Sequence, residues 1–331
     1  MSIAAKIVAA VVAAVVVAAL ALAVVDSAAP LPVPPPLADP LPAASPPADM
    51  QVFQLPTGIT HRTAAFAYRG GSFGDKRDFS MTAVLVHHPK GDILIDTGFG
   101  RSVDEQIRLL PLPFRLMTSY EKLTPAADQL RAAGYDVSGG DGPGKKISAI
   151  LLTHAHWDHV SGAADLPGIP ILVTPQEQRF ISEGSVVMAV ARSIPAARFQ
   201  TYTFEGGPYL GFPHNHDVYG DGSIVIVPAP GHTPGSVVIF LAVPGGKRYA
   251  LVGDLVWQLE GIRELEERPW LWRTLADVDP GAVRENIRRM SAIAQRFPEF
   301  TLVPAHDSRG FASMPTLSEK QPSAAALPPA E

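Results

Sequence analysis

Three imidazoles and a carboxylate lie within residues 154–159, HAHWDH, directly after the apolar run 147–152. Two histidines separated by one residue point the same way only from a loop or an extended backbone, because a helix would turn them about 200° apart. Imidazole nitrogens and carboxylate oxygens are ligands of borderline divalent ions such as zinc. The stretch therefore predicts a metal site, and Asp158 and His159 lie far enough along the chain to reach a second ion.

Three later residues extend this pattern. His232 lies in the segment PGHTPGS (230–236), Asp254 ends the segment LVGD, and His306 lies in the segment VPAHD. The linked set resembles the ligand pattern of the metallo-β-lactamase superfamily, a large group of mostly hydrolytic metalloproteins. The resemblance runs from about Thr82 to Asp307 and is far more specific than the first motif alone.

The resemblance implies two ions, three terminal ligands for each, and one bridging carboxylate. The ligands of the first ion would be His154, His156 and His232, those of the second Asp158, His159 and His306, and the bridge Asp254. We expect two zinc ions per chain, with manganese, iron or cobalt as competitors because no thiolate is present. A hydroxide bridging the ions would be the nucleophile, and Asp158 would accept a proton as the leaving group departs.

Four further residues are candidates for supporting roles. Asp96 lies in an Asp-Thr-Gly turn like one in the family, and we expect it to bond a ligand histidine, the alternative being a turn residue that bonds its own backbone. Lactonases of the family carry a Tyr three residues after the bridging Asp, where this chain has Trp257. An indole donates one hydrogen bond and no useful proton. Either the substrate differs from that of the lactonases or another residue, Tyr209 or Tyr219, fills the role of that Tyr; Trp257, Tyr209 and Tyr219 are the expected substrate-binding residues.

The layout is closest to that of the N-acyl homoserine lactonases and the organophosphate hydrolases of the family. The chain has no Cys, so it does not match the β-lactamases that use a Cys ligand, and His156 stands where the redox members have Glu. We expect hydrolysis of an ester, lactone or related bond in a hydrophobic small molecule. The alternatives are a β-lactam, thioester or phosphotriester hydrolase, or a non-catalytic metal-binding or sensing protein of the same fold.

Charge and composition exclude other classes. The net charge is −5 and Lys and Arg form no basic stripe, which argues against nucleic acid as substrate or partner. Without Cys the chain has no disulfide bonds. One α/β domain is the expected organisation for the catalytic part.

Residues 7–25 are nineteen consecutive Ala, Val, Ile and Leu residues between Lys6 and Asp26. As a helix this run would be roughly 28 Å long, close to the ~30 Å of a bilayer core. We expect segment 1–26 to be an uncleaved membrane anchor or a signal peptide cleaved near Ala23. Either predicts an exported catalytic domain, periplasmic or anchored in the inner membrane, with membrane contact through residues 7–25 if they are retained.

The rest of the chain divides by composition. Residues 27–50 are a Pro-rich linker, expected to form a stiff extended tether, and they precede a hydrolase domain at 51–316. Residues 317–331 are expected to be a disordered tail. The segment 214–217, HNHD, has metal-like spacing but no family counterpart, so we expect a loop or pocket rim.

Short apolar runs punctuated by Gly and Pro predict an α/β protein, and the resemblance implies a four-layer αββα sandwich behind the N-terminal hydrophobic helix or signal segment. We expect a hairpin of 82–87 with 92–95, helices at 125–133 and 279–296, and strands at 147–152, 224–227, 236–243, 249–252 and 301–303. The long segments 109–120 and 180–212 would shape an apolar pocket, or else pack on the core.

Overall fold

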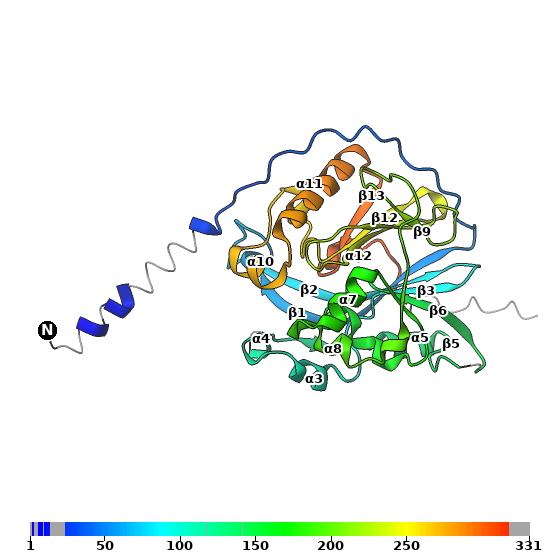
Figure 1. Cartoon of the computed structure of the whole chain (residues 1–331), viewed down its shortest axis with the longest axis horizontal. Helices are drawn as coiled ribbons and strands as arrows, with labels where there is room; N and C mark the ends of the chain where they lie inside the picture. The colour runs from blue at the N-terminus through cyan, green and yellow to red at the C-terminus, as the bar shows by residue number, and fades with distance from the viewer. Residues whose placement is uncertain are drawn as a thin grey trace, which may run out of the picture.

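Two β-sheets pack face to face in the computed structural model, which describes residues 2, 6–8, 10–13, 24–116, 118–140 and 142–317 (Figure 1). The strands of the first sheet are, in order, β4 (Glu121–Lys122), β1 (Gln51–Thr63), β2 (Lys76–His87), β3 (Asp92–Ile95), β6 (Lys145–Leu151), β7 (Ile171–Val173) and β8 (Phe199–Thr201), with β5 (Tyr135–Asp136) paired to β6. Those of the second are β13 (Phe300–Pro304), β12 (Arg248–Gly253), β11 (Val237–Ala242), β10 (Ile224–Pro228) and β9 (His216–Asp217).

The central strands are buried on both faces. Successive side chains of a strand point to opposite faces, so Val84 and Val86 of β2 join the core between the sheets, while Leu85 packs outward. In β11, Ile239 points inward and Phe240 outward. Burial on both sides explains why these runs are apolar without alternation. The three cores confirm the predicted αββα layering.

Helices cover the outer face of each sheet (Figure 1). Those whose side chains enter the outer core of the first sheet are α2 (Ala64–Ala67), α3 (Val103–Gln106), α5 (Ala126–Ala132), α6 (Trp157–Val160), α7 (Pro175–Glu183), α8 (Ala189–Arg192) and α10 (Trp270–Ala276). The second sheet is covered by α9 (Glu260–Arg263) and α11 (Pro280–Arg296). The short helices α4 (Leu112–Leu116) and α12 (Ser308–Phe311) complete the set.

α11 shows how the sequence specifies one of these elements. Asp279 caps it by accepting hydrogen bonds from Gly281 N (2.9 Å) and Ala282 N (3.0 Å). Its buried apolar residues recur at helical spacing and pack into the outer core of the second sheet: Val283, Ile287, Met290 and Ile293. The helix predicted at 279–296 is therefore confirmed.

The other predicted elements are also present, with ends shifted by a few residues. The hairpin forms between β2 and β3, and Gly91 N closes its turn by donating to His88 O (2.8 Å). The 13-residue strand β1 was not predicted, because Pro56 and Gly58 resemble strand breakers; they mark a shift in its register with β2.

The long segments expected to line a pocket mostly form packed structure. Within 180–212, Met188 and Phe199 are buried in the outer core of the first sheet and Phe212 in that of the second. The segment 109–120 includes the short helix α4. Ordinary packing, the alternative expected for these segments, is what segment 180–212 shows, whereas Leu109 and Leu112 of the other segment are exposed.

Both ends of the chain lie largely outside the described residues. These omit residues 9 and 14–23 of the apolar run, and the predicted tail 317–331 is described at Leu317 alone. Among the residues that are described, no helix is both long and apolar enough to cross a membrane.

The Pro-rich segment lies on the body. Residues 28–47, which we call the strap, contain neither helix nor strand. Leu31 N donates to Leu265 O (2.8 Å), Gly211 N donates to Asp39 Oδ2 (2.6 Å), and Ser45 N donates to Asp221 O (2.7 Å). In Figure 1 the strap is the dark blue trace that runs from the α10 end over α11 toward β9. The strap is therefore part of the body rather than a spacer in front of it.

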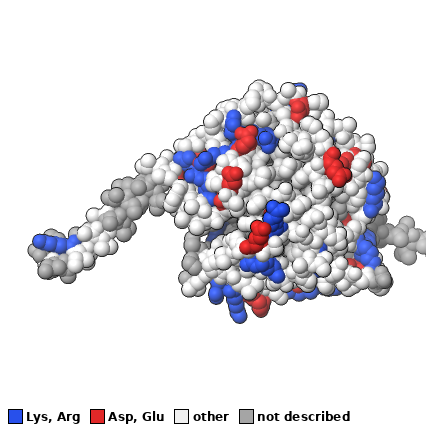
Figure 2. Space-filling model, in the orientation of Figure 1, with Lys and Arg blue, Asp and Glu red and all other residues white. Residues whose placement is uncertain are grey.

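Charges on the surface are mixed in sign. On the face shown in Figure 2, Lys and Arg alternate with Asp and Glu among wide uncharged areas, and no basic stripe is visible. This face offers no electrostatic footprint for a nucleic acid.

Candidate metal centre

The first histidines follow directly from the end of β6. His154 and His156 lie in the loop between β6 and α6, and His156 has an extended backbone (φ −64°, ψ 158°) that ends where α6 begins. Asp158 and His159 lie in the single turn of α6. The side chains of His154 and His156 extend from a non-helical segment, as their spacing requires. The helical turn that follows directs Asp158 and His159 toward the same region.

The remaining candidates follow other strands. Asp254 directly follows β12 and His306 closely follows β13; these strands are parallel, so their carboxyl ends lie at the same sheet edge. His232 comes from the loop after β10. Gly253 has a positive φ (53°), and a Cβ there would lie 2.9 Å from Thr153 Cβ. The β12 end thus approaches the loop that carries His154 more closely than a larger residue would allow.

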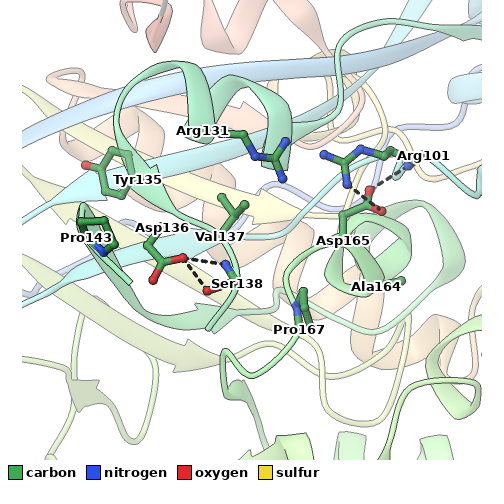
Figure 3. A pocket seen from close by; sticks show the side chains of 10 residues that line it. All are labelled: Arg101, Arg131, Tyr135, Asp136, Val137, Ser138, Pro143, Ala164, Asp165 and Pro167. Atoms are coloured by element: carbon green, nitrogen blue, oxygen red, sulfur yellow. Dashed lines mark hydrogen bonds and ion pairs between the residues drawn. The ribbon is translucent and has the colours of Figure 1, made fainter. Parts of the chain in front are cut away.

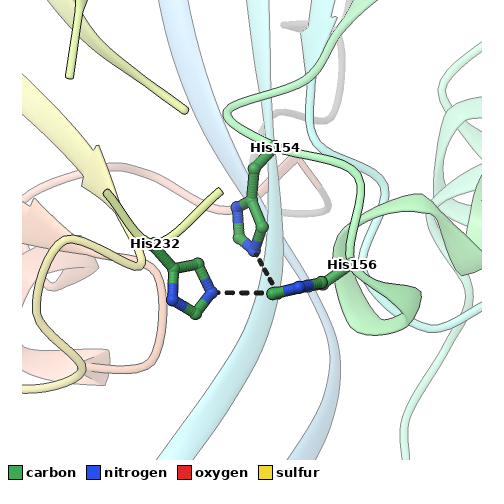
Figure 4. Close-up of side chains that lie close together, drawn as sticks. All are labelled: His154, His156 and His232. Atoms are coloured by element: carbon green, nitrogen blue, oxygen red, sulfur yellow. Dashed lines mark hydrogen bonds between the residues drawn. The ribbon is translucent and has the colours of Figure 1, made fainter. Parts of the chain in front are cut away.

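Three ring nitrogens converge at the first cluster (Figure 4). His156 Nδ1 lies 3.1 Å from His154 Nε2 and 2.9 Å from His232 Nε2. His154 and His232 are buried, and His156 is partly exposed. Three nitrogens at this spacing from three separate side chains form a site for a cation.

The carboxylate of Asp254 stands between two sets of imidazoles. Its Oδ2 lies 3.4 Å from His232 Nε2 and 4.0 Å from His154 Nε2. Its Oδ1 lies 3.2 Å from His159 Nε2 and 3.1 Å from His306 Nε2. Each oxygen faces its own cluster, which is the geometry expected of a bridging ligand.

Asp158 completes the second cluster. Its Oδ2 lies 3.4 Å from His306 Nε2, and Asp158, His159 and His306 offer ligand atoms within 4.8 Å of one another. All seven predicted ligands therefore come together. Their assignment as ligands stays a prediction.

Acceptors behind the rings fix which nitrogen faces the centre. Three Nδ1–H groups donate away from it: His159 to Asp96 Oδ2 (2.9 Å), His232 to Asp277 Oδ1 (3.0 Å) and His306 to Ser80 O (3.0 Å). Each Nε2 then carries its lone pair toward the centre, as a metal-ligating imidazole does.

Asp96 also holds the loop of the first histidines. Thr153 N donates to its Oδ1 and Thr153 Oγ1 to its Oδ2, both at 2.8 Å. Its backbone is in the left-handed region (φ 51°), uncommon for a residue other than Gly. Asp96 thus makes the contact with a ligand histidine expected of it.

Burial and charge act in opposite directions at this site. Burial, helped by the neighbouring histidines, lowers the pKa of His154 and His156 well below the usual value. Burial also disfavours the charged form of His159, yet Asp96 and Asp254 raise its pKa well above the usual value. Burial acts to raise the pKa of Asp254, but His306 and His159 hold it well below its usual value. The site keeps an ionised carboxylate among imidazoles.

Unpartnered buried atoms test whether these residues suit a divalent ion. His159 Nε2 and Asp254 Oδ1 are buried and have no hydrogen-bond partner among the described residues. Buried polar atoms without a partner are rare in proteins. A divalent cation would satisfy both, and a set of imidazole and carboxylate donors is one that such ions accept. The residues fit a metal ion.

A network that the sequence did not reveal lies behind the first cluster. Arg268 Nη1 donates to Asp277 Oδ1 (2.7 Å), and its Nη2 donates to the backbone oxygen of Asp254. The guanidinium lies 4.7 Å from the ring centre of Trp257. Arg268 and Asp277 belong to no motif, and only the fold brings them to Asp254 and His232.

Glu177 joins two ligand-bearing loops. Its buried carboxylate accepts from Ala155 N (2.7 Å), between His154 and His156, and from Thr233 Oγ1 (2.6 Å) and Gly235 N (3.1 Å) beyond His232. Burial raises the pKa of this carboxyl.

The three predicted substrate residues have different surroundings from those expected. Trp257 lies at the site, but its Nε1–H donates to Asp254 Oδ2 (2.9 Å), so its one donor is used within the protein. Tyr209 packs on Phe240 in the outer core of the second sheet. Tyr219 Oη donates to Gly91 O (2.5 Å) at the β2–β3 turn, the end of β3 away from Asp96. The structure brings neither tyrosine to the metal centre.

Two other features lie apart from the centre. In the described part of the chain, no group of three potential ligands includes His214 or His216. A surface pocket of about 520 Å³ (Figure 3) has none of the seven candidate ligands in its lining. Its basic residues are paired, Arg101 with Asp128 and Asp165 and Arg131 with Asp128. The pocket offers no uncompensated charge to a ligand.

Comparisons with known proteins agree with this geometry. The family model of the metallo-beta-lactamase superfamily matches residues 77–306. A probable metallo-hydrolase of Mycobacterium tuberculosis is 28% identical over 237 residues, covering 68% of this chain and 73% of its own. The N-acyl homoserine lactonase AttM of Rhizobium radiobacter is 22% identical over 275 residues, covering 80% and 96%.

The fold is also that of a solved N-acyl homoserine lactone hydrolase with the product N-hexanoyl-L-homoserine bound at its catalytic metal centre. The TM-score is 0.62 at 18% identity, covering 83% of this chain and 98% of the other. The fold and the His/Asp cluster define a metal-dependent hydrolase. The chain belongs to the metallo-β-lactamase superfamily.

Proposed function

We propose that the chain is a dinuclear zinc hydrolase that opens a lactone or cleaves an ester in a small molecule with an apolar part. The observation that carries the proposal is the position of Asp254, with one oxygen toward His154 and His232 and the other toward His159 and His306. A carboxylate placed in this way divides the cluster into two ion sites.

Zinc suits the donors of both sites, because imidazole and carboxylate ligands without thiolate match its preferences, with manganese, iron and cobalt as competitors. Two such ions would lower the pKa of a shared water and polarise the carbonyl oxygen of a substrate.

The side chains have separate tasks in this proposal. The buried histidines and Asp254 hold the charge of the site in fixed positions. Asp158 is only 12% exposed in its side chain, but it lies on the side that solvent reaches, as does His156. From there a carboxylate oxygen of Asp158 would take the proton released by the attacking water and give it to the departing alkoxide oxygen, which leaves as an alcohol.

Relatives and surroundings support an apolar ester or lactone as substrate. Several relatives are N-acyl homoserine lactonases. Aromatic rings adjoin the second cluster, with Phe79 stacked 6.0 Å from His306 and Trp257 at 6.1 Å from Phe79. Both rings are buried, so the second cluster has apolar surroundings on this side.

The test compares the same substitution, His→Ala, at a candidate ligand and at a histidine outside the metal centre. His156→Ala removes a candidate ligand, whereas His216→Ala removes a histidine of another His-x-His segment that joins no cluster. We expect His156→Ala to bind about one metal equivalent instead of two. Its rate should fall more than roughly 100-fold, since even residues behind the ligands change activity by 10–100-fold. His216→Ala should retain both metal equivalents and the rate.

The readouts are elemental analysis and hydrolysis of a panel containing acyl homoserine lactones, an aryl ester, a phosphotriester, a β-lactam and a glutathione thioester. Full activity of His156→Ala with two bound metals would refute the ligand assignment. Activity confined to the β-lactam, thioester or phosphotriester would refute the substrate class.

We also propose that residues 7–25 act as a signal peptide or membrane anchor and that the catalytic body works outside the cytoplasm. The support is the apolar sequence of this run and the single Lys6 before it. The mass of the protein recovered from cell fractions distinguishes the two forms. A full-length protein recovered only from the cytosol would contradict both.

A further inference from the structure

The apolar run ends at a fixed point on the body. Asp26, the residue after the run, accepts two hydrogen bonds: Trp270 N donates to its Oδ1 (2.6 Å) and Gly70 N donates to its backbone oxygen (2.8 Å). Trp270 is the first residue of α10. The chain therefore leaves the body at the amino end of α10.

Exposed apolar side chains surround this exit. On α10, Trp270, Leu271 and Leu275 are exposed, Leu275 by 63%. Phe73, in the loop that continues from Gly70, is 86% exposed. We call these four residues the α10 face. Large apolar side chains gathered in one place on a surface mark a contact site.

A second apolar element lies at the same end of the molecule. Figure 1 places α4 and α10 at the end where the N-terminal segment leaves the body. Leu109 and Leu112 are exposed there, and the exposed Arg108 and Arg115 flank them. Apolar residues with a Trp and flanking Arg are typical of surfaces that enter the headgroup region of a bilayer.

The strap removes the spacing that a free linker would supply. Asp26 is hydrogen-bonded directly to Trp270 and Gly70, and the strap that follows it lies against the body, so residue 25 lies next to the amino end of α10. Leu31 N bonds to Leu265 O, only a few residues before α10 in the sequence. A bilayer that holds residues 7–25 would therefore lie directly beside α10.

We propose that the α10 face, together with Leu109 and Leu112, contacts the surface of a lipid bilayer, so that the body rests on the membrane. This inference rests on the proposed membrane association of residues 7–25, but not on hydrolysis. The proposed occupant is lipid rather than a second copy of the chain. The apolar run emerges beside this face, so a bilayer that holds the run would lie next to the face as well.

Packed aromatic rings connect α10 to the metal centre. Trp272 of α10 lies 4.2 Å from Phe66, which stacks at 5.1 Å on Trp257, whose N–H bonds to Asp254. Packed aromatic rings thus join the bridging carboxylate to the lipid-facing end.

The absence of Cys gives a direct test. Single substitutions Leu275→Cys and Leu112→Cys introduce unique sites for a nitroxide label at exposed positions. Lys247→Cys is the matched control, because Lys247 is exposed and directly precedes β12, at the end of that strand away from Asp254. The full chain is reconstituted into phosphatidylcholine vesicles containing phosphatidylglycerol, and label relaxation is measured with a water-soluble nickel chelate and with oxygen.

We expect the labels at 275 and 112 to lose accessibility to the nickel chelate and gain accessibility to oxygen when vesicles are added, with the label at 247 unchanged. A chain that fails to float with vesicles would overturn both the anchor and the contact. A chain that floats with positions 275 and 112 still open to nickel would overturn the contact alone. Shielding already present without lipid would also overturn it, since the cover would then be protein.

Discussion

The ring of His232 is oriented by a carboxylate that is itself held in place. Asp277 accepts from His232 Nδ1 at 3.0 Å and from Arg268 at 2.7 Å. Both carboxylate and guanidinium are almost fully buried. A buried ion pair of this kind fixes position, because moving either partner leaves the other charge without compensation.

We predict that Asp277→Asn weakens metal binding while the fold persists. The amide is uncharged, so it holds the His232 N–H and Arg268 less firmly, and loss of such partners reduces metal affinity by roughly 10–100-fold. Zinc affinity is measured by competition with a chromophoric chelator, and circular dichroism monitors the fold. The control is Asp49→Asn at an exposed position outside the centre. Equal affinity in both variants would show that Asp277 does not position His232.

The candidate ligands could be predicted from the sequence, whereas Glu177 could not. His154 to His159 share one segment, and the other ligands follow strand ends, so a family pattern finds them. Glu177 was missed because Thr174-x-x-Glu177 is the pattern of a capping box, in which Glu bonds the helix's own end. Thr174 Oγ1 does cap α7, accepting from Glu177 N at 3.2 Å, but the carboxylate bonds Ala155, Thr233 and Gly235 instead. No local pattern distinguishes the two uses.

At the scale of the elements, Glu260 connects three elements that are distant in sequence. It lies on α9 and accepts from Arg77 of β2 (2.9 Å) and from Arg309 of α12 (2.7 Å). Burial acts to raise the pKa of its carboxyl, but the hydrogen bonds, above all from Arg309, lower it to about 2. The ionised form is therefore favoured in the folded protein.

We predict that Glu260→Gln lowers the free energy of unfolding near pH 7 by roughly 1.5–3 kcal/mol, as expected for hydrogen bonds to a charged group. Because the folded pKa lies below the usual value of 4.5, this stabilisation is complete above about pH 4.5 and is lost as pH falls toward 2. Urea unfolding at pH 7 and pH 3 measures the difference in the free energy of unfolding between the parent and the variant. This difference should be smaller at pH 3.

The control for this prediction is Glu285→Gln on α11. The side chain of Glu285 is 57% exposed and pairs with Arg288 at the surface, where ion pairs contribute about 0–1 kcal/mol. We expect a small loss of stability from this variant. A gap for Glu260→Gln that stays constant between pH 7 and pH 3 would contradict the assigned role.

Element prediction succeeded where burial on both faces produced apolar runs, as for β6, β11 and β12. It failed for β1, whose Pro56 and Gly58 are accommodated by a register shift against β2. It failed also for α10, where Pro269 precedes a segment rich in Trp and Leu that packs only Trp272 and Ala276 inward. A helix with so few inward residues lacks the repeated helical spacing of apolar residues that identifies α11.

Across the whole molecule, the strap changes how the catalytic body relates to the N-terminal run. Composition alone predicted a tether, because a Pro-rich segment lacks the side chains of a packed element. It packs nonetheless, since the body supplies the partners: Arg288 Nε donates to Pro32 O (2.9 Å) and Arg248 Nη2 to Pro42 O (3.0 Å). Such contacts depend on residues more than 200 positions away and cannot be inferred from the segment itself.

We predict that backbone amides of the strap exchange hydrogen slowly. Leu31 N and Ser45 N donate to Leu265 O and Asp221 O, and an amide so bonded exchanges only when the strap lifts from the body. Hydrogen exchange of the full chain, read by mass spectrometry on peptides from residues 28–49, is the measurement. Asp39→Asn, which weakens the bond from Gly211 N, should accelerate exchange near residue 39 more than at Leu31. Exchange at the rate of a free peptide throughout 28–49 would show that the segment is a tether after all.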